Sequence, residues 1–186
     1  MENITFFREW LPLQKSEFRI LAMLADRGEF KGNLSDMCRY LSITPQDKHR
    51  KQLRASIQKL QEEGFIECEI SGRTYTLRAV PKEKKIEIPR RWTEPIIHHE
   101  YSSETVAWEQ VLKVLLWIYD NCHPIIQDIM IADDLNVSVD VITSAKKVLD
   151  KDFRAIIREI EKITLPDGSK RNVGQRLAAV AWWSAE

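Results

Sequence analysis

The sequence predicts a mainly α-helical α+β protein in which a helix-turn-helix pattern occurs twice. The first copy occupies residues 33–44 and continues into an apolar repeat that ends at Gly64. The second copy occupies residues 132–138 and continues into an apolar repeat at residues 142–149. Each copy predicts a short helix, a tight turn and a longer helix, which is how a protein presents one helix to a DNA groove. The two copies differ in charge, and this difference guides the functional prediction.

Apolar residues at helical spacing predict three helices in the first half of the chain. The first is expected to begin at the N-cap Ser16 and to end before Gly28. The second is expected at residues 34–41. Thr44 and Pro45 read as the N-cap and first-turn proline of the third helix, which is expected to end at Gly64.

Residues 65–70 and 74–80 alternate like two strands around the turn formed by Ser71, Gly72 and Arg73. Three helices followed by a hairpin make a winged helix. The sequence therefore predicts a winged-helix domain at residues 1–80. Residues 81–103, which are interrupted by Pro81, Pro89 and Pro95, are expected to form a linker rather than a helix, although residues 86–88 could add a short strand.

The second half, residues 104–186, predicts a similar winged-helix-like domain. A long apolar helix is expected at residues 104–122 and a second helix at residues 125–135. A third begins after Ser138 and either runs past 20 residues or breaks at residues 150–152. A turn at residues 166–171 and a final strand at residues 173–183 complete the prediction.

The third helix of the first domain presents a basic face opposite its apolar residues Leu53, Ile57 and Leu60. Lysine and arginine neutralise phosphates, and arginine and glutamine also make paired contacts with guanine and adenine edges. A basic helix face is also consistent with simple exposure to solvent. On the third helix of a winged-helix pattern, the sequence favours DNA contact through Lys48, Arg50, Lys51, Gln52, Arg54, Ala55, Gln58 and Lys59, with Arg73 at the hairpin.

Residues 16–80 resemble the winged helix-turn-helix superfamily of bacterial DNA-binding regulators. The segment Leu60-Gln-Glu-Glu-Gly-Phe-Ile66 is close to the family's Leu-x-x-x-Gly-Leu-Ile ending, although residues 42–53 are longer than the family's usual turn. The resemblance implies that Arg73 is a wing contact. It also implies base-facing or phosphate-facing positions at Arg50, Lys51, Gln52, Arg54, Ala55 and Gln58. The layout of two winged helices on one chain is similar to that of replication initiators from mobile elements.

The second helix-turn-helix copy lacks the basic face of the first and is poorly suited to binding DNA. Its groove-facing positions are Val139, Asp140, Val141, Thr143 and Ser144, and an aspartate near phosphates is repelled. We therefore expect the second domain to serve in dimerisation or partner binding. Lys170, Arg171 and Arg176 could instead form a basic wing. Trp182 and Trp183 are expected to complete the core of the domain or to belong to an interface.

Composition and motifs exclude several classes of protein. The formal net charge is zero, with a balance of +2 for residues 1–80, +1 for residues 81–100 and −3 for residues 101–186. DNA affinity must therefore come from a local patch. No apolar run reaches the roughly 18 residues that suggest a membrane span, and no secretory signal precedes the first helix, so a cytoplasmic location is expected.

No motif of an enzyme, a metal site or a cofactor site is present, and we expect no cofactor. Histidines 49, 98, 99 and 123 lack the spacing of a helical metal pair, and Cys38, Cys68 and Cys122 read as buried free thiols or a regulatory thiol.

The leading prediction is a homodimeric protein that binds double-stranded DNA in transcriptional regulation or in the replication of a mobile element. The alternative is a non-enzymatic scaffold that binds a protein partner. The small bacterial chromosome-segregation subunits that clasp a kleisin chain are similar in length and also carry tandem winged helices.

Overall fold

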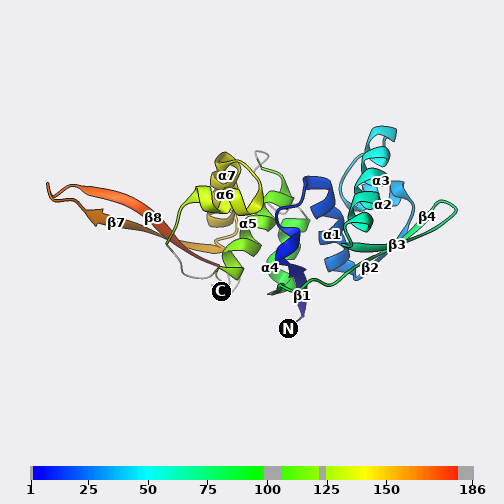
Figure 1. Ribbon diagram of the computed structural model, residues 1–186, viewed down its shortest axis with the longest axis horizontal. Helices are drawn as coiled ribbons and strands as arrows, with labels where there is room; N and C mark the ends of the chain where they lie inside the picture. The colour runs from blue at the N-terminus through cyan, green and yellow to red at the C-terminus, as the bar shows by residue number, and fades with distance from the viewer. Residues whose placement is uncertain (1, 99–105, 122–124, 180–186) are drawn as a thin grey trace. The chain divides into compact units, whose positions relative to one another are not determined.

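The computed structural model describes residues 2–98, 106–121 and 125–179 (Figure 1). Its contacts divide the chain into an N-terminal unit, Asn3–Glu87, and a C-terminal unit, Ile88–Glu186 together with Met1–Glu2. Helices and small sheets occur in both units, so the predicted α+β class is confirmed. Within the described ranges, no helix combines the length and the apolar character needed to cross a membrane.

The N-terminal unit contains three α-helices, a 3-10 helix and a three-stranded antiparallel sheet of order β2-β4-β3. A second sheet pairs β1 with β5, which continues into the start of the C-terminal unit. The elements are β1 (Asn3–Phe7), the 3-10 helix η1 (Arg8–Trp10), α1 (Lys15–Arg27), β2 (Glu29–Gly32), α2 (Leu34–Tyr40), α3 (Asp47–Glu62), β3 (Ile66–Ser71), β4 (Thr74–Ala79) and β5 (Lys85–Pro89).

The core of the N-terminal unit forms between α1, α3 and β4. α3 buries Leu53, Ile57 and Leu60, the three residues at helical spacing that the sequence places inward. Phe18 of α1 and Leu77 of β4 are fully buried. The opposite face of α3 is therefore left to solvent, as the periodicity predicts.

Of the three helix starts predicted in this unit, the start of α2 at Leu34 is confirmed and the other two need correction. α1 begins at Lys15 with Gln14 as its N-cap, while Ser16 lies inside the helix, with its Oγ 2.7 Å from Ser56 Oγ. α3 begins at Asp47 with Gln46 as its N-cap, so Thr44 and Pro45 precede the helix. The Thr44 carbonyl oxygen instead accepts a 2.8 Å hydrogen bond from the backbone nitrogen of Gln46. The same carbonyl oxygen lies 2.7 Å from His49 Nδ1, so it joins the turn before α3 to the first turn of the helix.

The C-terminal unit also has a three-stranded antiparallel sheet, of order β6-β8-β7. Its helix α5 is buried on nearly every side, including Glu109 and Lys113. In Figure 1, β7 and β8 extend as a long hairpin away from the helices of this unit. The elements are α4 (Arg90–Ile97), α5 (Trp108–Asp120), β6 (Ile125–Ile126), α6 (Asp128–Leu135), α7 (Val139–Lys151), β7 (Ile156–Thr164) and β8 (Lys170–Ala179).

The two units repeat one order of elements, helix, strand, helix, helix, strand and strand, with the last strand in the middle of each sheet. The short strands β2 and β6 were not expected. Residues 125–135, for which one helix was predicted, are divided because Ile125 and Ile126 pair with β8 and α6 begins only at Asp128.

The helix predicted after Ser138 ends at Lys151, and Asp152 is its C-cap. The predicted break at residues 150–152 is therefore confirmed, and the alternative of a helix of more than 20 residues is wrong. β8 begins at Lys170, before the predicted position 173. Trp182 and Trp183, the end of the predicted last strand, lie outside the described residues, as do positions 104, 105 and 122 at the ends of the predicted 104–122 helix.

The segment expected to be a linker, residues 81–103, contains β5 and α4 in its described part. The prediction that its prolines exclude a helix is wrong. Pro89 is the N-cap of α4, where no amide donor is needed, and Pro95 lies near the end of the helix. Burial of Trp92 and Ile96 and an edge contact between the Trp92 and Tyr119 rings, with centroids 5.5 Å apart, hold α4 in place.

Candidate nucleic-acid interface

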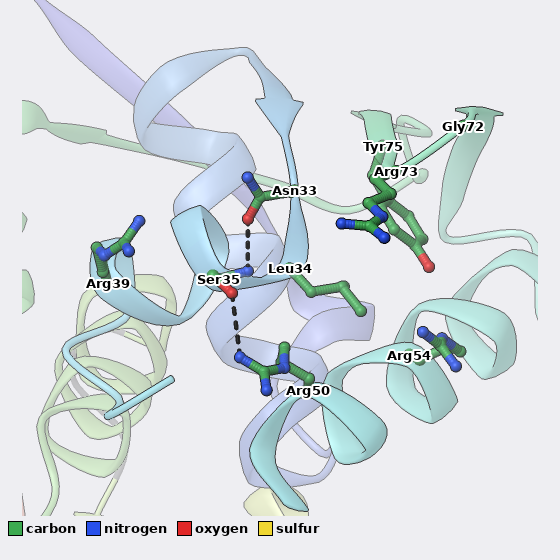
Figure 2. A pocket seen from close by; sticks show the side chains of 9 residues that line it. All are labelled: Asn33, Leu34, Ser35, Arg39, Arg50, Arg54, Gly72, Arg73 and Tyr75. Atoms are coloured by element: carbon green, nitrogen blue, oxygen red, sulfur yellow. Dashed lines mark hydrogen bonds between the residues drawn. The ribbon is translucent and has the colours of Figure 1, made fainter. Parts of the chain in front are cut away.

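The N-terminal unit has a cavity of about 570 Å³ where α2, α3 and the β3–β4 hairpin converge (Figure 2). Four arginines from these three elements line it: Arg39 from α2, Arg50 and Arg54 from α3, and Arg73 from the hairpin turn. Among the described residues, no acidic side chain lines the cavity. Such a concentration of positive charge in a concave surface attracts anions. The other lining residues are Asn33, Leu34, Ser35, Gly72 and Tyr75.

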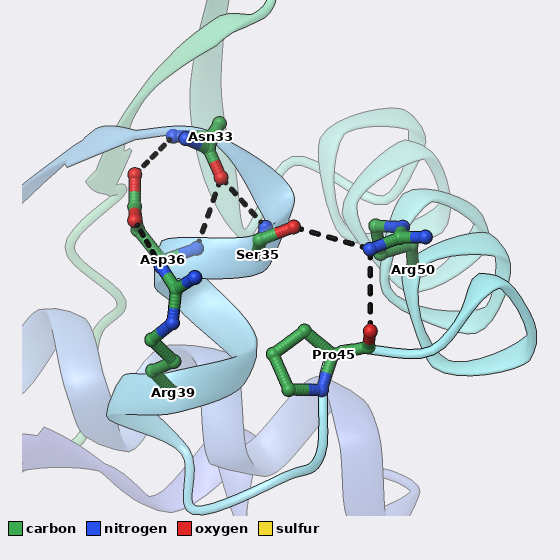
Figure 3. Close-up of polar contacts among 6 residues, drawn as sticks. All are labelled: Asn33, Ser35, Asp36, Arg39, Pro45 and Arg50. Atoms are coloured by element: carbon green, nitrogen blue, oxygen red, sulfur yellow. Dashed lines mark hydrogen bonds and ion pairs between the residues drawn. The ribbon is translucent and has the colours of Figure 1, made fainter.

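A capping box fixes the start of α2 beside this cavity (Figure 3). The side-chain oxygen of Asn33 accepts hydrogen bonds from the backbone nitrogens of Ser35 (2.8 Å) and Asp36 (3.0 Å). The Asn33 backbone nitrogen in turn donates to the Asp36 carboxylate at 3.2 Å. Arg39 donates to the same carboxylate at 2.9 Å and remains 67% exposed. Arg39 is therefore partly neutralised but accessible.

Arg50 ties α2 to the turn before α3. Its Nη1 donates to Ser35 Oγ and to the Pro45 carbonyl oxygen, both at 3.3 Å (Figure 3). Its guanidinium also forms an ion pair with Asp47 in the first turn of α3. These bonds occupy much of the donor capacity of the guanidinium. Arg50 therefore contributes mainly to the shape of the cavity wall.

Arg54 and Arg73 are the two arginines of the cavity that have no ion-pair partner within the described part of the chain. Arg54 is exposed on α3, and Arg73 is exposed in the two-residue turn of the hairpin. The first residue of this turn, Gly72, has a φ of +61°, which is the glycine position of a type II′ turn. Figure 2 shows the two side chains on different walls of the cavity. Both charges are available to a ligand.

The structure brings together three of the nine predicted site residues, Arg50, Arg54 and Arg73, in the lining of this cavity. Lys48, Lys51 and Ala55 lie on the exposed face of α3, outside the lining. Both lysines are without an ion-pair partner in the described ranges. They therefore extend the positive face of α3 beyond the cavity.

The remaining three predicted residues lie outside the cavity lining, and two of them are already bonded to carboxylates of the protein. Gln52 lines a separate hollow of about 240 Å³, together with Lys15, Arg19 and His49 among others. Gln58 donates to the carboxylate of Glu62 at 2.8 Å. Lys59 lies 3.6 Å from the buried carboxylate of Glu17 on α1.

The sequence reasoning missed the part of the cavity that α2 and β4 supply. Arg39 and Tyr75 fall in it because α2 and β4 both flank β2, and Gly32 of β2 pairs with Tyr75. The start of α2 was predicted correctly at residue 34, and the capping box of Asn33 and Asp36 explains why the helix begins there. No local pattern indicates that Arg39 shares a cavity with Arg73.

The C-terminal unit has a lysine where the N-terminal unit has Arg54. Lys146 lies eight residues after the N-cap of α7, as Arg54 lies eight residues after the N-cap of α3. Lys146 is only 4% exposed; its Nζ donates to Asp128 at 2.5 Å and to the Gln175 side chain at 3.1 Å. Burial lowers the pKa of Lys146, and the bond to Asp128 opposes this shift. The charge of Lys146 is therefore neutralised within the unit and is not available to a ligand.

The cysteines and histidines that the structure describes form no evident reactive centre. Burial raises the pKa of the Cys38 and Cys68 thiols, which disfavours the reactive thiolate. In the described ranges, no group of three or more histidine, cysteine, aspartate or glutamate side chains could hold a metal ion. His99, His123 and Cys122 lie outside those ranges.

No protein-family model matches the chain, and no curated protein or solved structure matches it significantly.

Proposed function

We propose that the protein binds double-stranded DNA through its N-terminal unit, with α3 in the major groove and the β3–β4 hairpin beside the backbone. In this proposal both units are winged helix-turn-helix domains arranged in tandem. The observation that carries the proposal is a pair of arginines, Arg54 and Arg73, which lie on separate walls of one cavity and have no ion-pair partner among the described residues. A phosphate between helix and hairpin would neutralise both charges.

The electrostatics of the cavity favour a phosphate ligand. Arginine presents a planar fork of donors that matches two phosphate oxygens, and such charge-assisted bonds are about twice as strong as neutral ones. Lys48 and Lys51, on the same helix, would reach neighbouring phosphates of an extended backbone. Half or more of the hydrogen bonds in protein–DNA complexes go to phosphates and sugars, so such contacts would set the register of α3 in the groove.

The test is fluorescence anisotropy of a labelled duplex of random sequence across a salt series. We compare the wild type with Arg54→Glu/Arg73→Glu and with Lys84→Glu/Lys85→Glu, which makes the same charge change at exposed residues of β5 and the residue before it. We expect the arginine variant to lose most of its affinity and the slope of log K against log salt to fall by about 2, at roughly 0.9 per lost contact.

The lysine control should retain the wild-type slope. Equal losses in both variants would show that only overall charge matters, and the proposed interface would be wrong. A wild type that does not bind duplex at low salt would reject the proposal altogether.

A second proposal concerns self-association through the C-terminal unit. Of the eight large apolar side chains that are exposed in the described part of the chain, seven belong to this unit. Apolar surface of this kind favours a protein partner, and a second copy would give a dimer suited to a palindromic site. Analytical ultracentrifugation of the wild type and of Ile129→Glu/Met130→Glu tests this, because a monomeric wild type would reject the proposal. The seven residues are Ile125, Ile129, Met130, Val139, Ile157, Ile160 and Ile163.

A further inference from the structure

A second basic hollow lies in the C-terminal unit between α7 and β7. Its volume is about 250 Å³. Apart from Ile156, the residues around it are polar or charged. The lining consists of Asp128, Thr143, Lys146, Lys147, Asp150, Lys151, Ile156 and Arg158.

The charges in this hollow leave an excess of cations. Lys146 is neutralised by Asp128, with which it forms a buried ion pair. Lys147, Lys151 and Arg158 are exposed and have no ion-pair partner among the residues that the structure describes. Asp150 is the one other acidic residue among the described residues that line the hollow, and it opposes these three charges.

The fold directs the three free cations toward one another. Lys147 and Lys151 are four residues apart on α7 and therefore share a face of the helix. Arg158 pairs across the sheet with the buried Leu177, so it lies on the helix-facing side of β7. The charge of Arg158 also contributes to lowering the pKa of Lys146, consistent with its position beside α7. Three like charges held together in this way repel one another unless an anion lies between them.

We propose that this hollow is a phosphate-binding site of the C-terminal unit. Arg158 would hold two phosphate oxygens through its fork of donors, and Lys147 and Lys151 would supply the remaining charge. The volume lies below the range of about 300–1,000 Å³ typical of pockets for whole small molecules, which favours a single phosphate group over a larger apolar ligand. The phosphate belongs to the backbone of DNA or to a free phosphorylated molecule.

The site does not depend on the proposed function of the N-terminal unit. Thr143, one of the groove-facing positions 139–144 where the sequence predicts repulsion of DNA, also lines the hollow. The three cations of the site, however, come from the second half of α7 and the start of β7. The C-terminal unit would then contribute phosphate binding without inserting the first half of α7 into a groove.

The test is a nuclear magnetic resonance titration of the full-length protein, following the backbone amides of α7 and β7. One arm uses inorganic phosphate against sodium chloride of equal ionic strength, and the other uses a random duplex. The variant Lys147→Gln/Lys151→Gln/Arg158→Gln removes the site, while Lys31→Gln/Lys84→Gln/Lys85→Gln removes the same charge from exposed positions of the N-terminal unit. Circular dichroism verifies that both variants fold.

We expect saturable shifts at residues 146–158 in the wild type and the control variant, and their loss in the site variant. If the amide chemical shifts change with both phosphate and duplex, or with duplex alone, the ligand of the site is the DNA backbone. Shifts with phosphate alone assign it to a free phosphorylated molecule. The absence of shifts in both arms, or identical shifts in the site variant, would overturn the proposal.

Discussion

Arg54 and Lys146 occupy the same position in the two units, but among the described residues only Lys146 has an internal partner. Each lies eight residues after the N-cap of the last helix before the hairpin. Arg54 is exposed and lines an open cavity, whereas Lys146 is 4% exposed and bonded to Asp128 and Gln175. The same position in the fold thus carries a positive charge that a ligand can reach in the N-terminal unit, and a positive charge neutralised by an internal ion pair in the C-terminal unit.

The register of the two sheets explains how this difference arises. Gly32 pairs with Tyr75 in the N-terminal unit, and Ile126 pairs with Gln175 in the C-terminal unit. Tyr75 and Gln175 are therefore equivalent positions beside the last helix. Gln175 can bond Lys146, whereas Tyr75 only forms part of the cavity wall around the arginines.

The first prediction concerns the buried pair of Lys146 and Asp128. Asp128→Asn would leave a cation uncompensated at a side chain that is 5% exposed, and we expect it to lower the free energy of unfolding by about 3 kcal/mol. The double variant Lys146→Met/Asp128→Leu should recover most of this loss, because neither charge then needs solvation. Urea denaturation followed by tryptophan fluorescence measures both, with the exposed Asp150→Asn as control. An unchanged stability in Asp128→Asn would show that the pair is not required.

The sequence was sufficient for the parts of the fold that local patterns control. The spacing of Leu53, Ile57 and Leu60 oriented α3, and the turn at Gly72 and Arg73 placed the hairpin. β2 was missed because Phe30 is its only buried residue, and its stability comes from pairing with β4, far away in the sequence. Pairing between distant segments carries no local signal.

For the candidate site, too, the sequence predicted residues that local patterns mark, but not the contacts they make. Helical periodicity identified Arg54, the basic composition of the helix and the family resemblance identified Arg50, and the turn identified Arg73. Periodicity did not reveal that Arg50 is engaged by Ser35 and Pro45, because these bonds depend on how α2 approaches α3.

The second prediction separates structural from binding arginines on α3. Arg50→Ala removes the two hydrogen bonds to Ser35 and Pro45, and we expect the free energy of unfolding to fall by about 1–2 kcal/mol. Arg54→Ala should change it by less than about 0.5 kcal/mol and should weaken duplex binding instead. Urea denaturation and anisotropy on the same two variants check this division. The opposite pattern would assign the structural role to Arg54.

The third prediction concerns alkaline pH. The Tyr40 hydroxyl donates to Asp26 at 2.5 Å, and the Arg27 guanidinium lies 4.0 Å from the centre of the Tyr40 ring. Burial, followed by the bond to Asp26, raises the pKa of Tyr40 from 10.0 to about 12. The unfolded chain releases this proton at lower pH than the folded one. The stabilising contribution is therefore complete below pH 10 and is lost as the pH rises toward 12.

Urea denaturation of the wild type and of Tyr40→Phe, below pH 10 and near pH 12, tests this contribution. Tyr40→Phe should be less stable by about 1 kcal/mol below pH 10, because the bond to Asp26 is missing. Near pH 12 the difference between the two proteins should shrink. A constant difference at both pH values would mean that the Tyr40 pKa is not raised.

The fourth prediction compares two lysines of the same helix. Lys51 is exposed and has no ion-pair partner within the described ranges, whereas Lys59 lies 3.6 Å from the buried carboxylate of Glu17. A lysine that is already neutralised releases fewer DNA counterions when it meets a phosphate. We therefore expect Lys51→Gln to lower the slope of log K against log salt by about 0.9 and Lys59→Gln to leave it nearly unchanged.

Anisotropy titrations of the two single variants against one duplex measure this difference directly. Each variant removes one positive charge from α3, so overall charge cannot account for a different slope. Slopes that fall equally in the two variants would show that DNA contacts both halves of α3, and that the ion pair with Glu17 opens on binding. Two slopes equal to that of the wild type would show that neither lysine contacts a phosphate. A larger effect at Lys59 than at Lys51 would move the proposed contact from the first half of α3 to its end.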